Sequence, residues 1–220
     1  MHEDKLDSGR KDKVVALTKA IVGAIPYIGG AVGEALSLVP GQRMDRIVQY
    51  TKYLNERLDA LEESINHNTP ENIDMIERGA HQACHALSDT RLEAIASLVA
   101  NAMQAEDVEK TRRARLLKLL DQLDDDELLI LNAYSQSYGG RRDNIWNEID
   151  IPKGIHMGSD RGEMDKSYLY NLGKARLSDF GLIKAKNFDK KGKPTSHEIT
   201  PLGRLFMREI GQPSPCDVRN

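Results

Sequence analysis

The stretch "RMDRIVQYTKYLNERLDALEESI", residues 43–65, carries the strongest periodic pattern in the chain. Its stripe positions recur at alternating steps of three and four, which places them on one side of a helix over three heptads. The pattern predicts either a long helix of a bundle or a coiled-coil seam between copies of the chain, and the polar Thr51 in the stripe weakens the seam. The seam residues would be Ile47, Leu54, Leu58, Leu61 and Ile65.

Helix signals continue downstream of this stretch. Thr69 is an expected N-cap with Pro70 at the first helical position, and Thr90 and Glu93 have the spacing of a capping box. The acids of "DDDELLILNAY", residues 124–134, suit a helix N-terminus. Alanines are frequent here and would let helices approach closely. Together with residues 43–65, and with the hairpin described next counted in, these signals predict a bundle of about six helices.

An uncharged run, "AIVGAIPYIGGAVG", covers residues 20–33 upstream of the long stripe. It is too short for a single transmembrane helix, which needs about 20 mainly apolar residues, and its proline and glycines would interrupt one. The run predicts a Gly-rich hydrophobic hairpin that is buried in the bundle at rest. The alternative is a hairpin that enters a membrane on activation. The turn of this hairpin would be formed by Ile25, Pro26, Tyr27, Ile28, Gly29 and Gly30.

The C-terminal part of the chain changes pattern after two glycines and two arginines at residues 139–142. A helix that stops at Gly181 is followed by two short strands, residues 182–188 and 195–200, with Gly192 in the turn between them. A last helix begins with Thr200 as N-cap and Pro201. With the helix at 124–134 and a short helix at "DNIWNEI", this order predicts a winged-helix-like α+β domain.

A winged helix raises the question of DNA binding, because its helix can enter the major groove while the hairpin touches the phosphate backbone. The candidate phosphate-binding residues are Lys174, Arg176, Lys190, Lys191 and Lys193. Against this role stand three acids on the same helix, Glu163, Asp165 and Asp179, and a net charge of −3 for the chain. The competing interpretation is a domain that docks on protein and carries a solvated basic hairpin.

Signals of catalysis or metal binding are sparse. The motif "HQACH" places His81, Cys84 and His85 on one helix face, where they could bind zinc, but the sequence offers no fourth ligand. No nucleophile motif, phosphate loop or dinucleotide fingerprint is present. We therefore predict no enzymatic activity, no cofactor, no bound metal and no small-molecule substrate.

The composition of the chain limits the class of protein and the compartment in which it is expected. The 220 residues are 40% hydrophobic and 30% charged, which is typical of a folded chain, and the two cysteines fit a reducing compartment. The N-terminus lacks the pattern of a secretory signal, so we expect a cytoplasmic protein, with membrane association in the active state as the alternative for residues 20–33. The predicted parts are a flexible N-terminus at 1–13, a helical bundle at 14–123, the winged-helix-like domain at 124–211 and a flexible tail at 212–220.

Three passages carry a resemblance to a known family: "IPYIGGAVGEALSLVPGQRMDRI", "LLKLLDQLDDDELLILNAY", and "LGKARLSDFGLI" with "ITPLGRLFM". Their order resembles bacterial proteins of the abortive-infection alpha (Abi-alpha) type. The resemblance implies a role in antiviral defence, in which an infected cell is halted or killed, and it brings no catalytic residues. We thus expect a non-enzymatic effector or regulator that acts through a homo-oligomer, a partner protein or a membrane. The alternative is a winged-helix transcriptional regulator that binds DNA.

Overall fold

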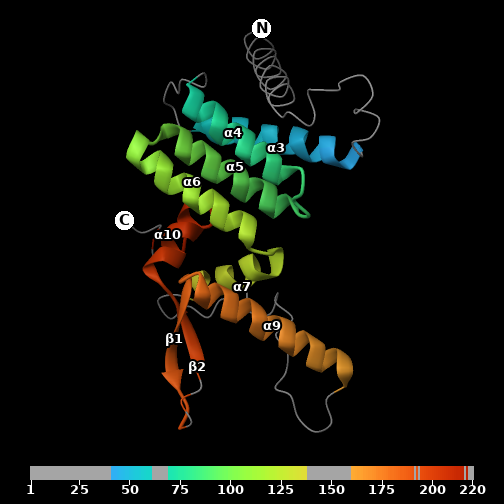
Figure 1. The fold of residues 1–220 in the computed structure, drawn as a ribbon, viewed down its shortest axis with the longest axis vertical. Coiled ribbons are helices and arrows are strands. Elements are labelled where there is room, and N and C mark those ends of the chain that lie inside the picture. Colours follow the sequence, from blue (N-terminus) through green and yellow to red (C-terminus); the bar gives the residue numbers. More distant parts are fainter. Residues whose placement is uncertain are drawn as a thin grey trace. The chain divides into compact units, whose positions relative to one another are not determined.

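The computed structural model describes residues 41–60, 69–137, 160–190, 192, 194–215 and 217. These residues form seven helices and one two-stranded antiparallel sheet (Figure 1), which confirms the mainly α class. The chain divides into two compact units, Met1–Gln122 and Leu123–Asn220. The division lies within one residue of the boundary between 123 and 124 that the sequence predicts.

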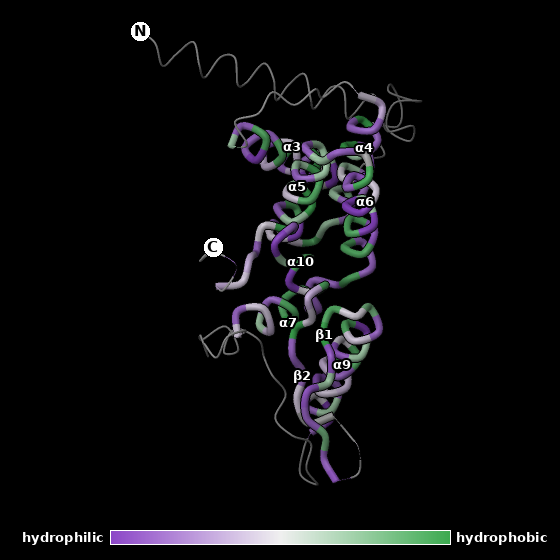
Figure 2. Tube along the Cα trace, turned by 90° about the vertical axis from the view of Figure 1, so that its left-hand side faces the viewer, coloured by the Kyte–Doolittle hydropathy of each residue, from purple (hydrophilic) through white to green (hydrophobic). Residues whose placement is uncertain are grey.

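The first unit is a bundle of helices. Its described elements are α3 (Gly41–Ala60), α4 (Pro70–Ala83), α5 (Asp89–Gln104) and α6 (Asp107–Gln122). Helix α5 is central, because it packs against each of the other three. Every residue from Ala94 to Ala100 of α5 is buried, as a helix enclosed by neighbours requires. The outer helices alternate hydrophilic and hydrophobic residues along their length (Figure 2).

The periodic stripe of α3 lies in the core of this bundle. Ile47, Thr51 and Leu54 are fully buried in a helix that packs mainly against α5. The Thr51 hydroxyl donates a hydrogen bond of 2.7 Å to the backbone carbonyl of Ile47, so the polar residue in the stripe is satisfied within its own helix. Ile47 and Leu54 are therefore core residues of one chain rather than a free seam. Leu58 is half-buried, and residues 61–68 lie outside the described part.

A close helix crossing forms where α3, α4 and α5 meet. A Cβ atom added at Gly79 of α4 would collide with the Tyr50 hydroxyl of α3 and would lie 2.8 Å from Cγ2 of Val99 on α5. The alanines expected to permit close approach are buried in the same bundle: Ala80, Ala83, Ala94, Ala96, Ala100 and Ala102. Small side chains at these positions set the short distance between the helices.

The N-cap residues of the helices show which of the predicted helix starts are correct. Thr69 accepts a hydrogen bond of 3.3 Å from the backbone N–H of Asn72, which confirms it as the N-cap of α4. The expected capping box at Thr90 is wrong, because α5 begins two residues earlier. Its N-cap is Ser88, whose hydroxyl accepts from the backbone N–H of Arg91 at 3.2 Å. Ser is an equally good cap, and Asp89 then meets the positive end of the helix dipole.

The second unit combines three described helices with a hairpin. Its elements are α7 (Asp125–Gln136), α9 (Arg161–Asp179), β1 (Ile183–Phe188), β2 (Pro194–Ile199) and α10 (Pro201–Glu209). The strands pair antiparallel, with Ile183 opposite Ile199 and Lys184 opposite Glu198. Gly181 has a φ of 71° directly after α9, where only glycine fits easily, so the predicted stop signal is confirmed.

The start of α10 packs closely against the short link between α9 and β1. Thr200 caps α10 by accepting a hydrogen bond of 3.0 Å from the backbone N–H of Gly203, as the sequence predicts. A Cβ atom added at Gly203 would collide with the backbone oxygen of Leu182. Leu177, Leu182 and Phe206 are fully buried around this contact. The hairpin is thereby anchored at its base by both helices.

Several predictions fall on residues outside the described part. These are the hairpin turn formed by Ile25, Pro26, Tyr27, Ile28, Gly29 and Gly30, the short helix at "DNIWNEI", and the flexible N-terminus at 1–13. Among the helices of the described ranges, none combines the length and the apolar character needed to cross a bilayer. Membrane action through residues 20–33 stays a prediction.

Candidate docking site on helix α9

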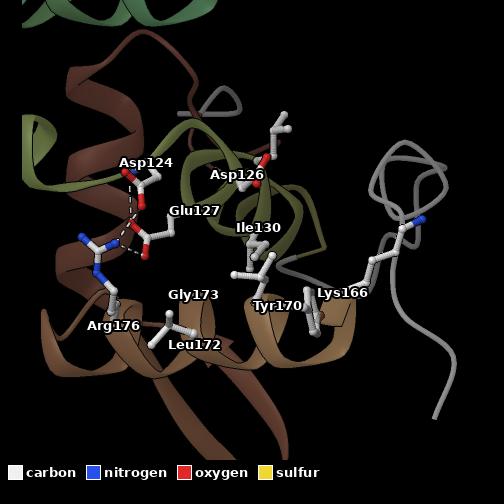
Figure 3. A pocket seen from close by; sticks show the side chains of 11 residues that line it. Asp124, Asp126, Glu127, Ile130, Lys166, Tyr170, Leu172, Gly173 and Arg176 are labelled. Carbon is white, nitrogen blue, oxygen red and sulfur yellow. Dashed lines mark hydrogen bonds and ion pairs between the residues drawn. The ribbon is translucent and has the colours of Figure 1, made fainter. Parts of the chain in front are cut away.

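Arg176, a candidate phosphate ligand on α9, is held by two carboxylates at the N-terminus of α7, those of the N-cap Asp124 and of Glu127 in the first turn. Its Nη1 atom lies 2.8 Å from Oδ2 of Asp124 and 3.0 Å from Oε1 of Glu127 (Figure 3). Glu127 is almost fully buried, and its carboxylate also accepts a hydrogen bond of 2.9 Å from the backbone N–H of Asp124. Arg176 therefore joins α9 to the N-terminus of α7, and a phosphate would have to compete with these carboxylates.

Lys174, the other candidate on α9, lies in a half-buried cluster between α7, α9 and β2. Its Nζ atom is 4.7 Å from the centroid of the Tyr170 ring, a cation–π distance. The hydroxyls of Tyr134 and Tyr170 share a hydrogen bond, and the Tyr134 ring meets His197 edge-on at 6.5 Å. Desolvation lowers the pKa of Lys174, and desolvation with the nearby Lys174 charge lowers the pKa of His197. Lys174 thus contributes to the packing of the unit.

The basic hairpin is partly neutralised by its own strand partner. The Nζ atoms of Lys184 and Lys186 each lie 3.2 Å from a carboxylate oxygen of Glu198, and their hydrogen bonds lower the pKa of that carboxyl. Lys190 is exposed. Lys191 and Lys193 lie outside the described residues. The candidate nucleic-acid residues are therefore spread over three settings instead of forming one described basic surface.

The middle of the outward side of α9 carries exposed apolar residues. Tyr168, Leu169 and Leu172 are 62%, 68% and 56% exposed, whereas Gly173 and Leu177 are buried on the inner side. The sequence pattern groups all the apolar residues of this helix together and so misses the exposed ones. At 100° per residue, Leu172 lies about 140° and Tyr168 about 180° from Leu177 around the helix axis. These angles, which can be calculated from the sequence, indicate that the helix has two apolar faces.

A groove between α7 and α9 borders this apolar face (Figure 3). It has a volume of about 430 Å³, and its apolar lining includes Leu129, Ile130, Leu169 and Leu172. Gly173 lines it as well, and a Cβ atom added there would lie 3.3 Å from Cδ1 of Ile130. Leu129 of α7 is itself 46% exposed. Exposed apolar side chains from two helices therefore meet in one patch, a feature typical of interaction sites.

The zinc candidates on α4 and after it do not converge. Cys84 is buried, and burial raises the pKa of its thiol, which disfavours the thiolate that zinc requires. His81 and His85 are exposed, and their ring centroids lie 5.6 Å apart. Within the described residues no group of three His, Cys, Asp or Glu side chains is placed to hold a metal ion.

Comparison of the chain with family models, with curated proteins and with solved structures finds no match. The second unit holds the exposed apolar side chains of α7 and α9 described above. Its strongest feature is the patch formed by Leu129, Tyr168, Leu169 and Leu172, called the α9 patch below.

Proposed function

We propose that the chain is a non-enzymatic interaction protein whose second unit is a winged-helix-like docking domain, with the α9 patch as its contact surface. The carrying observation is the exposure of Tyr168, Leu169 and Leu172 on the helix that would read DNA in a winged helix. A helix that reads DNA needs cations and hydrogen-bond donors toward the grooves and phosphates, whereas an apolar face gains most from contact with protein.

The energetics favour a protein contact. Full burial of one leucine side chain contributes about 1.5–3 kcal/mol, so three large apolar side chains can form the centre of an interface. A small-molecule ligand fits less well, because two of the charged groups that line the groove, Glu127 and Arg176, already bind each other. The order α7, α9, hairpin and α10 supports the winged-helix-like description, and the resemblance to Abi-alpha proteins supports a role in phage defence.

A plating assay tests this function directly. Bacteria that express the chain are challenged with a panel of phages, and the number of plaques is compared with that of cells carrying an empty vector. We expect fewer plaques with the wild type, and we expect Leu172→Asp to lose the protection while it keeps the circular-dichroism spectrum and melting temperature. Leu202→Asp is the matched control, because Leu202 is an exposed leucine of the same unit outside the patch.

Two results would contradict the proposal. Protection that survives in folded Leu172→Asp excludes the α9 patch as the functional surface. Absence of protection against every phage, at an expression level confirmed by immunoblot, excludes the defence role. Equal loss in Leu202→Asp would show that any new charge on this unit is harmful.

DNA binding is the second candidate, favoured by the exposed lysines Lys184, Lys186 and Lys190 on the hairpin. Its test is duplex binding at low salt, with Lys190→Ala combined with Lys191→Ala and Lys193→Ala. A DNA-binding hairpin predicts weaker binding for all sequences and a smaller salt dependence in the triple variant. An intact protein that binds no duplex at low salt rules this candidate out.

A further inference from the structure

The exposed side of α9 carries a second periodic pattern that the core-facing residues conceal. Six exposed positions recur at alternating steps of four and three along the helix. They are Arg161, Asp165, Tyr168, Leu172, Ala175 and Asp179. This is the spacing of the contact positions in a two-stranded coiled coil, and it runs over nearly the whole length of α9. The helix therefore presents a continuous seam to the outside of its own unit.

Resting on the proposed docking function, we infer that the occupant of this seam is α9 of a second copy of the chain, packed antiparallel. In a symmetric dimer each contact occurs twice, so a self-complementary surface is required. An antiparallel pair centred on residue 170 places Tyr168 opposite Leu172 of the second copy. The same register places Arg161 opposite Asp179, so two unlike charges close each end of the apolar centre.

Other registers of the same two helices are less favourable. A parallel pair sets Asp165 opposite Asp165 and Asp179 opposite Asp179, and like charges in direct contact are destabilising. An antiparallel register shifted by one heptad sets Arg161 opposite Leu172 or Asp179 opposite Tyr168, and so buries a charge against an apolar side chain. The central register pairs Tyr168 with Leu172 and Arg161 with Asp179, and its one charge opposite an apolar residue is Asp165, which faces the small Ala175.

The charged ends are available for this contact. Arg161 and Asp179 are both exposed, and within the described residues neither forms an ion pair or a hydrogen bond through its side chain. By contrast, the inner face of α9 commits Arg176 to the carboxylates of α7. The 19 residues of α9 correspond to a length of about 28 Å, which gives an interface at the small end of the specific range. We expect a reversible dimer whose dissociation constant is in the micromolar range.

Sedimentation equilibrium of the full chain over a range of concentrations tests the dimer. Leu172→Asp should weaken association by about a hundredfold or more, since two buried leucines are lost in each dimer. Leu202→Asp should leave it unchanged. Arg161→Asp alone and Asp179→Arg alone should each weaken self-association by about five- to tenfold, because both ends of the seam then hold like charges.

Mixing the two single charge variants gives the decisive result. Arg161→Asp paired with Asp179→Arg restores unlike charges at both ends, so we expect the mixture to form a heterodimer while each variant alone stays largely monomeric. The double variant, with both substitutions in one chain, should dimerise like the wild type. No contact other than an antiparallel α9 pair predicts this pattern.

The outcomes separate this inference from the proposed function. A wild type that is monomeric at all concentrations, or a dimer indifferent to both charge variants, overturns the α9 pair. If Leu172→Asp still abolishes phage protection in that case, the docking function stands and its partner is another protein. An altered emission spectrum of Trp146 in monomeric Leu172→Asp would show that the chain's own residues contact the seam, and this result would overturn the inference as well.

Discussion

The two units of the chain differ in how their exposed apolar side chains are arranged. In the described residues of the first unit, the exposed large apolar side chains are Ile73, Leu87 and Val108, and they lie singly on α4, on a loop and on α6. In the second unit, Phe188 and Leu202 are also exposed, but Tyr168, Leu169 and Leu172 lie together on α9 beside Leu129. Scattered exposed residues need no explanation, whereas a contiguous patch indicates a partner.

The difference has a cause in side-chain size. Helix α5 is enclosed because its alanines and the nearby Gly79 let three helices surround it closely. Helix α9 uses Gly173 in the same way toward α7, but on only one side. On its other side, Leu169 and Leu172 are more than half exposed where they border the groove beside α7, and Tyr168 is more than half exposed as well. Helix α9 thus carries Gly173 and the buried Leu177 on its inner face and large exposed apolar residues on another face, an arrangement that suits one contact inside the chain and one outside it.

The largest effect that this comparison predicts is for truncation of a leucine. Leu98 of α5 is fully buried, so Leu98→Ala should lower the free energy of unfolding by about 2–5 kcal/mol. Leu172→Ala should change it by less than about 0.5 kcal/mol, because Leu172 is more than half exposed. Urea unfolding of both variants, at a concentration below the dissociation constant of the proposed dimer, measures the contrast. Equal destabilisation would show that Leu172 is part of a core.

A smaller effect is expected at the crossing of α3, α4 and α5. Gly79→Ala should destabilise the chain by about 1–3 kcal/mol, because the new methyl group overpacks the contact with Tyr50 and Val99. The Tyr50 hydroxyl is buried and has no hydrogen-bond partner among the residues that the structure describes, and burial raises the pKa of this phenol. Tyr50→Phe should therefore be neutral or stabilising. In the double variant it should recover part of the loss, and strict additivity would contradict a direct clash.

The sequence predicts the helical elements, the hairpin and the caps Thr69 and Thr200 because these depend on local patterns and on the few residues that suit a turn. The α3 stripe shows the limit of such patterns. Its period fits both a bundle core and a coiled coil, and only the position of α5 beside Ile47 and Leu54 decides for the core. Periodicity defines a face, but it does not name the surface that covers that face.

The candidate site was harder to predict for two physical reasons. Lys174 and Arg176 look free in the sequence, and their partners Tyr170, Asp124 and Glu127 come from a helical turn and from a helix about fifty residues away. The α9 patch was missed because hydrophobicity alone does not separate the inner from the outer face. The angle between Leu172 and Leu177 separates them, but its use requires knowing which side α7 covers.

The third prediction concerns the link between α7 and α9. Arg176→Ala leaves the buried Glu127 carboxylate with fewer hydrogen bonds, so it should destabilise the chain by about 1–2 kcal/mol. Lys190→Ala is the matched control, because it removes one positive charge at an exposed position. Thermal unfolding measures both variants. If Arg176→Ala leaves stability intact but weakens duplex binding, Arg176 acts on DNA and the ion pairs with α7 are incidental.

The smallest expected effect is the pH dependence of the second unit, through His197. Burial first, and then the charge of Lys174, lower the pKa of His197 from its ordinary value of 6.5, so the unfolded chain binds the proton more readily than the folded one. The stability tied to neutral His197 is complete above pH 6.5 and is lost as the pH falls through the lowered folded value. As the pH is lowered from about 7.5 to about 5.5, hydrogen exchange of the β2 amides should thus accelerate relative to that of the α5 amides. The rates are compared after correction for the intrinsic pH dependence of exchange.

His197→Gln provides the control for this effect, because glutamine has no charge to gain. The acid-induced loss of protection in β2 should shrink in this variant, while the intrinsic pH dependence of exchange in α5 stays the same. Lys174→Met should also reduce the effect, since it removes the cation that opposes protonation of His197. If both variants keep the full acid response, the pH sensitivity arises elsewhere, and the contact between Tyr134 and His197 serves packing alone. The difference between the two units would then lie in the α9 patch alone, and the charges of Lys174 and His197 would not contribute to it.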